Sequence, residues 1–267
     1  MTTTASEKAL VAPRVFTLAL FGLFLIAENA GGQEIRVMTS GGFAATYNAV
    51  VAEYERTTED SVVTAYGASM GGAPDSIPMR LERGEPADVV ILAAGALEEL
   101  IARGKVAPDS RVDLVRSRIG AAVRTGATEP DITTVEALRN TLLSAESIAY
   151  SASASGTYLE TELFVVLGIA EQLSDRSQRV EGERVGEVVA RGDAEIGFQQ
   201  ISELLPIAGI SYVGPLPDDV QRVTVFSAGI TTDATNPEGA QSLIEYLSSP
   251  ALGPVIIESG LEPVRSR

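Results

Sequence analysis

The chain has 267 residues, and its 20 Lys and Arg against 36 Asp and Glu give a formal net charge of -16. This charge repels nucleic acid and anionic lipid surfaces, so we expect neither as a partner. Cysteine and histidine are both absent, which excludes disulfides, thiolate nucleophiles, the usual zinc sites and histidine-dependent triads. The sequence indicates no metal site and no organic cofactor.

Residues 1 to 32 are predicted to be a signal peptide for export to the periplasm. Lys8 and Arg14 precede an apolar run from Val15 to Ile26, which is too short to span a bilayer and is typical of a signal-peptide core. Small residues at 27–30 form an imperfect cleavage site, so we expect cleavage near residue 30 and no stable membrane insertion afterwards. The alternative is a buried helix or an uncleaved anchor.

After residue 33, short β-branched runs alternate with stretches whose apolar residues have helical spacing. This alternation predicts parallel βαβ units in an α/β layered fold, with ligands bound outside the carboxyl ends of the strands. The predicted strands are 35–38, 61–66, 88–92, 119–124, 147–150 and 195–198, and the predicted helices are 43–56, 96–102, 135–143, 158–167 and 237–247.

Three strand-to-helix junctions, at 39–42, 67–72 and 151–157, are rich in glycine and hydroxyl side chains. Glycines let backbone amides approach a ligand, hydroxyls donate hydrogen bonds, and a helix N-terminus favours negative charge. Each loop alone could simply cap a helix, but three equivalent loops favour an anion site, and none has nucleotide-binding spacing. The candidate ligand-binding residues in them are Ser40, Gly41, Gly42, Ser69, Met70, Gly71, Ser155, Gly156 and Thr157.

From Glu34 to Val264 the chain resembles the molybdate-binding type of periplasmic solute-binding protein, a type II binding protein of ABC transporters. The most specific element is the turn from Gly84 to Asp88 into a hydrophobic strand. The other matching segments are Ile35 to Ser40, Gly156 to Tyr158, Ala194 to Gly197 and Pro237 to Leu261.

The resemblance implies two α/β lobes, each a central mixed sheet flanked by helices, with the ligand in the cleft between them. We expect residues 33–116 plus 229–267 in lobe 1 and residues 117–228 in lobe 2. The resemblance also implies that the protein delivers a small anionic ligand to an ABC transporter permease. We expect the protein to be a monomer.

The chain departs from that family at the positions that contact the ligand. The first ligand-binding serine of the family is replaced by Gly42, with Ser40 nearby, and the second loop is longer. Ser69 and Ser155 occupy the second and third positions. The fourth offers Arg184 or Val185, and Gln200, preceded by Gln199, replaces a tyrosine at the fifth.

Arginine and glutamine favour a larger organic acid over a metal oxyanion. Arginine binds a carboxylate through two parallel charge-assisted hydrogen bonds, and glutamine binds carboxyl or hydroxyl oxygens. The alternative for Arg184 is a surface ion pair with Glu181, Glu183 or Glu187.

The leading hypothesis is therefore an exported solute-binding protein that captures a di- or tricarboxylate for an ABC-type importer. One alternative is aconitate isomerase, an activity known on a scaffold similar to this one, which needs a base and a cationic clamp for an allylic proton shift. The sequence identifies no catalytic residue, although Asp75, Glu183, Tyr47 and Tyr158 could supply the base. Molybdate or tungstate binding, and a sensory or adhesive domain without a transporter, are the remaining alternatives.

Overall fold

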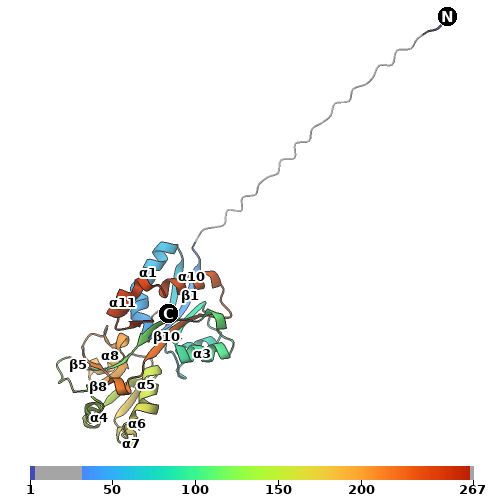
Figure 1. Cartoon of the computed structure of the whole chain (residues 1–267). Helices are drawn as coiled ribbons and strands as arrows, with labels where there is room; N and C mark the ends of the chain where they lie inside the picture. Colours follow the sequence, from blue (N-terminus) through green and yellow to red (C-terminus); the bar gives the residue numbers. More distant parts are fainter. Residues whose placement is uncertain (4–31, 265–267) are drawn as a thin grey trace. The chain divides into compact units, whose positions relative to one another are not determined.

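The computed structural model describes residues 1–3 and 32–264 of the chain. Residues 4–31 of the predicted signal peptide lie outside the described residues. Within the described part, no helix combines the length and apolar character that a membrane span requires. The residues from 32 onward form two β-sheets with helices packed on their faces (Figure 1).

The first sheet has six strands in the order β11-β4-β10-β3-β1-β2. Its parallel part brings the carboxyl ends of β1, β2 and β3 to one edge, whereas β10 pairs antiparallel with β3 and β4, and β11 with β4. The strands are β1 (Glu34–Ser40), β2 (Ser61–Gly67), β3 (Val89–Ala93), β4 (Val112–Ser117), β10 (Thr224–Ile230) and β11 (Glu262–Pro263).

The second sheet has five strands in the order β7-β6-β8-β5-β9. β6 pairs in parallel with β7 and β8, so these three strands also end at a common edge. β5 pairs antiparallel with β8 and β9. The strands are β5 (Ile119–Arg124), β6 (Ile148–Ser151), β7 (Ser177–Val180), β8 (Ile196–Gln200) and β9 (Ile210–Pro215).

Two crossovers connect the sheets. The chain leaves the first sheet through Arg118, between β4 and β5, and returns between β9 and β10. Gln221 fastens the crossovers together, because its side chain accepts a hydrogen bond from the Ile119 N–H and donates one to the Ile119 carbonyl, both at 2.9 Å. We call the six-stranded sheet with its helices lobe 1 and the five-stranded sheet with its helices lobe 2. The predicted lobe boundary near residue 228 falls inside β10, a strand of lobe 1.

Successive side chains of a strand point to opposite faces of its sheet, so the buried strands contribute to a core on each face. In β1, Ile35 and Val37 join the core under α1, α10 and α11, and Met38 joins the core under α2 and α3. In lobe 2, one core packs on α4, the 159–167 region and α7, and the other on α8. The helices are α1 (Gly41–Thr58), α2 (Ile77–Glu82), α3 (Ala94–Ala102), α4 (Val135–Ser144), α5 (Ala154–Tyr158), α6 (Phe164–Val166), α7 (Ala170–Leu173), α8 (Val185–Arg191), α9 (Ile201–Leu204), α10 (Pro237–Leu247) and α11 (Gly253–Glu258). Short helical turns are η1 (Pro108–Ser110), η2 (Leu159–Leu163, a π-helix), η3 (Asp218–Val220) and η4 (Pro250–Leu252).

Asp88 explains why the Gly84 to Asp88 turn is the most specific sequence motif. Its buried carboxylate accepts hydrogen bonds from the backbone N–H groups of Arg36 at 2.7 Å, Thr235 at 2.6 Å and Asn236 at 3.1 Å. Burial opposes the charge, but these donors hold the pKa of Asp88 below its ordinary value. The carboxylate thus joins β1, β3 and the start of α10.

The structure confirms the predicted fold class, which is a two-lobed α/β fold with a mixed sheet in each lobe. All six predicted strands and five predicted helices are present, and α10 has the predicted bounds. The sheets are not wholly parallel. Antiparallel pairs are made by β5 and by three strands that were not predicted, β4, β9 and β10. The predicted helix 158–167 is interrupted by the π-helix η2.

Candidate functional site

A cavity of about 490 Å³ lies between the lobes, where strand ends of both sheets meet. β1 and β2 bring their loops from lobe 1, and β6, β7 and β8 bring theirs from lobe 2. The cavity is therefore where ligands bind in open α/β sheets, outside the carboxyl ends of parallel strands. Its volume is that of a small-molecule site.

The first loop places Ser40 and the start of α1 at the cavity wall. Ser40 is 2% exposed, its Oγ has no hydrogen-bond partner within the described residues, and it does not cap α1. The first turn of α1 contains no acidic residue, so its free N–H groups keep their preference for an anion. Gly42 has room for no side chain, because a Cβ there would overlap the ring of Phe226.

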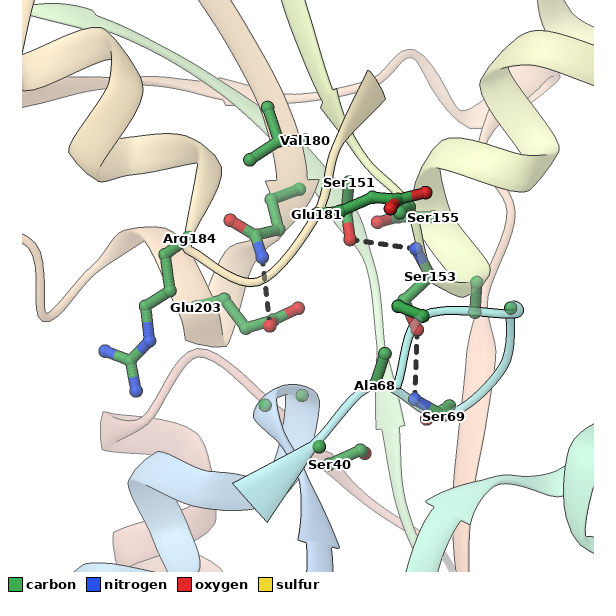
Figure 2. Close-up of a pocket in the computed structure, with 18 of the residues that line it drawn as sticks. Ser40, Ala68, Ser69, Ser151, Ser153, Ser155, Val180, Glu181, Arg184 and Glu203 are labelled. Atoms are coloured by element: carbon green, nitrogen blue, oxygen red, sulfur yellow. Dashed lines mark hydrogen bonds between the residues drawn. The ribbon is translucent and has the colours of Figure 1, made fainter. Parts of the chain in front are cut away.

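The second loop contributes Ser69, Met70 and Gly71 to the lining. The Ser69 hydroxyl accepts a hydrogen bond from the Ala93 N–H at 3.0 Å, which leaves its own proton free to donate to a ligand. The Ser69 N–H donates to Oγ of Ser153 at 3.2 Å, a contact between the two lobes. Figure 2 draws this hydrogen bond as a dashed line between the labelled Ser153 and Ser69.

The third loop places Ser155 in the lining, together with Ser151 and Ser153. Gly156 and Thr157 lie in α5, outside the cavity lining. Gly156 has a packing role, because a Cβ there would overlap the carbonyl oxygen of Ser151 and push α5 away from β6. A ligand-binding role for Gly156 and Thr157 stays a prediction.

Arg184 and Gln200 also line the cavity. Arg184 is half-buried at the start of α8, and within the described residues it forms no ion pair with a carboxylate. In Figure 2 its side chain extends on the Glu203 side, away from the serine loops. The Gln200 amide donates to Oγ1 of Thr224 at 3.0 Å, while its buried Oε1 has no partner among the described atoms.

Glu203, in the first turn of α9, is a functional candidate that we did not predict. It lines the cavity, and its Oε1 accepts a hydrogen bond from Nε2 of Gln199 at 3.0 Å. Burial raises the pKa of Glu203 to about 7, although Arg184 and Gln199 favour its charged form. A carboxyl with this pKa can both accept and return a proton near neutral pH.

The other candidate bases are less well placed. Tyr47 and Tyr158 lie outside the cavity lining. Their hydroxyls are engaged with Thr64 and the Val220 carbonyl, both at 2.7 Å, and burial raises both pKa values. Glu183 is exposed and pairs with Arg191 at 2.6 Å.

Acidic side chains also occur at the mouth of the cavity. Asp75, Glu181, Glu183 and Glu187 line it, but all four are exposed to solvent. Water screens such exposed charges strongly. The buried part of the wall instead includes serine hydroxyls, the two glutamines and the ring of Phe226, with the half-buried Glu203 beside them.

The chain belongs to the bacterial extracellular solute-binding proteins, whose family model matches residues 35–262. It is 43% identical over 256 residues to an aconitate isomerase of a Pseudomonas species, covering 94% of this chain and 98% of that protein. It is 26% identical over 246 residues to the molybdate-binding protein ModA of Azotobacter vinelandii, covering 88% and 92% respectively.

Solved structures agree on the fold. The periplasmic molybdate-binding protein of Azotobacter vinelandii superposes with a TM-score of 0.70 at 20% identity. The match covers 87% of this chain and 100% of the molybdate-binding protein. Together with the curated relatives, this confirms the predicted resemblance to molybdate-binding-type proteins and to their aconitate isomerase branch.

Proposed function

We propose that the protein is an aconitate isomerase, which interconverts cis- and trans-aconitate in the cleft between its lobes, with Glu203 as the base. The observation that carries the proposal is the Glu203 carboxyl, whose pKa is raised to about 7 beside neutral donors and Arg184, in a cavity whose other carboxylates lie exposed at its mouth. The 43% identity to an aconitate isomerase along nearly the whole of both chains supports this substrate.

The reaction moves one proton and one double bond and requires no oxidant or reductant. The Glu203 carboxylate removes a proton from the methylene carbon of aconitate, and the C–H electrons form a new double bond to the central carbon. The electrons of the old double bond then take a proton from Glu203 at the former vinylic carbon. Glu203 returns to its ionised form, so atoms and charge balance over the cycle.

The cavity wall would hold the three carboxylates of the substrate. Ser40, Ser69 and Ser155 present hydroxyls, and the start of α1 presents free N–H groups. Arg184 would neutralise charge beside Glu203, where the carbanion intermediate forms. Gln200 offers an amide that can bind a carboxylate oxygen.

Ligand capture without turnover is the second candidate, because the chain belongs to a solute-binding family. In this version the protein binds a polycarboxylate in the periplasm, closes through contacts such as Ser69 to Ser153, and delivers it to an ABC-type importer. Both versions place the protein in the periplasm, after cleavage of a signal peptide near residue 30.

Molybdate binding is less well supported. Gly42 offers no hydroxyl, and the ring of Phe226 fills the volume that a serine side chain would need. In addition, Val185 donates its N–H to Oε1 of Gln199 at 2.9 Å, so this amide already has a partner within the protein.

The test measures the ultraviolet absorbance change of trans-aconitate with the purified protein and its Glu203→Gln variant. We expect turnover by the wild type and a loss of at least about a hundredfold in Glu203→Gln. Glu136→Gln is the matched control, because Glu136 is also in the first turn of a helix but is exposed and outside the cavity. Thermal stabilisation by aconitate without turnover would favour the capture version.

A further inference from the structure

We infer that Gln199 is a positioning residue that holds Oε1 of Glu203, so that the proton exchanged with the substrate is carried by Oε2. This inference deepens the proposed function and rests on it. Gln199 is 3% exposed at the end of β8, and its side chain bridges two groups. Its Oε1 accepts from the Val185 N–H at 2.9 Å, and its Nε2 donates to Oε1 of Glu203 at 3.0 Å.

The orientation of the Gln199 amide is determined by its partners. A backbone N–H only donates, so the amide oxygen must face Val185. The amide nitrogen must then face Glu203. The backbone of Gln199 is fixed as well, because β8 pairs with β5 in the middle of the lobe 2 sheet, opposite Gly120.

The two oxygens of Glu203 consequently differ. Oε1 accepts the Gln199 N–H and packs so closely on α1 that a Cβ at Gly41 would overlap it. A proton on Oε1 would oppose the Gln199 donor, whereas a proton on Oε2 leaves that hydrogen bond intact. In Figure 2 the Glu203 oxygen without the dashed line is directed toward the serine loops.

One charged side chain, that of Arg184, acts on the pKa of Glu203 among the described residues. Arg184, at the start of α8, is the charged side chain whose field favours the carboxylate. The first turn of α1, which packs against Glu203 at Gly41, carries no acidic residue. Removing the Gln199 donor should therefore favour the protonated form of Glu203 without introducing a new charge.

The test compares Gln199→Leu with the wild type in two measurements. The first is the pH dependence of kcat for aconitate isomerisation. We expect the acid limb to rise by about one pH unit, which lowers kcat roughly fivefold at pH 7 and leaves it within about twofold at pH 9. Gln178→Leu is the control, because Gln178 lies exposed on β7 outside the cavity.

The second measurement is a carbon-13 NMR titration of the Glu203 carboxyl, assigned by its absence from the Glu203→Gln spectrum. It needs no turnover, so it separates the inference from the proposed function. An upward shift of the Glu203 pKa in Gln199→Leu supports the inference. An unchanged Glu203 pKa, or a kcat lowered equally at every pH, overturns it. A wild type without turnover refutes the isomerase proposal and leaves the NMR result to judge the role of Gln199.

Discussion

Gly42 and Phe226 share one volume at the cavity wall, because a Cβ on Gly42 would overlap the Phe226 ring. Phe226 lies on β10 in the lobe 1 core and is 2% exposed, so it has little freedom to move away. At this position the resemblance implies a ligand-binding serine in molybdate binders. The pair therefore changes the wall from a hydroxyl donor to an aromatic surface.

Gly42→Ser should consequently destabilise the protein without creating molybdate binding. The overlap with Phe226 predicts a loss of about 1–3 kcal/mol in the free energy of unfolding, the usual effect of overpacking a core. Urea denaturation measures it. In a Phe226→Ala background the cost of Gly42→Ser should fall by at least about 1 kcal/mol, and equal costs in both backgrounds would contradict the shared volume.

Glu203 should make the protein less stable as the pH rises. Its pKa is raised from 4.5 in the unfolded chain to about 7 in the fold. The stabilisation is therefore complete below pH 4.5 and is lost as the pH rises to about 7. Glu203→Gln should remove this loss and raise the free energy of unfolding at pH 8 by on the order of 1–3 kcal/mol. Denaturation at pH 5 and pH 8 measures it, and an unchanged difference between wild type and variant at the two pH values would contradict the raised pKa.

Asp88 should have the opposite pH dependence. Its pKa is lowered in the fold, so its stabilisation is present above the unfolded pKa of about 4 and is lost as the pH falls through the lower folded value. Asp88→Ala should cost about 3 kcal/mol at pH 7, because the buried N–H groups of Arg36, Thr235 and Asn236 lose their acceptor. Thermal unfolding measures the effect, and the stability difference between the wild type and Asp88→Ala should be smaller at pH 3 than at pH 7.

Ser153 should matter more for ligand affinity than for the stability of either lobe. Its hydroxyl accepts the Ser69 N–H across the cleft, so Ser153→Ala should weaken aconitate binding about fivefold, as expected for one neutral hydrogen bond. Isothermal titration calorimetry measures the change. Ser144→Ala, on the exposed surface of α4, is the control. Unchanged affinity in Ser153→Ala would show that this contact plays no part in closure.

The sequence predicted the strands that begin as β-branched or apolar runs, and missed strands whose apolar runs are broken or half-exposed. β9 is half-exposed along most of its length, and β10 contains Ser227 and Gly229, so neither has the apolar run that marked β1 or β3. Lobe 1 and lobe 2 could still be predicted, because the missed strands add to sheets whose parallel parts were already clear.

The loops of the site were predictable and its acid was not. Ser40 ends β1, and Ser69 and Ser155 follow β2 and β6, so their convergence follows from the parallel strand ends of the two sheets. Glu203 is in the first turn of a helix, where a glutamate is normally a solvent-exposed partner of the helix dipole. Its burial depends on Gly41, which is distant in sequence and leaves room for the carboxylate. The available signal was its position three residues after Gln200, at the end of a buried strand.

Transfer of a proton within aconitate by Glu203 can be measured by following the isomerisation in D₂O. The purified protein should interconvert trans- and cis-aconitate in D₂O, as followed by proton NMR, and deuterium should enter the product to the extent that the Glu203 carboxyl exchanges its proton with solvent before returning it. The Glu203→Gln variant should bind aconitate and incorporate none. Incorporation by Glu203→Gln at the wild-type rate, or aconitate bound by the wild type without any exchange or isomerisation, would contradict the account.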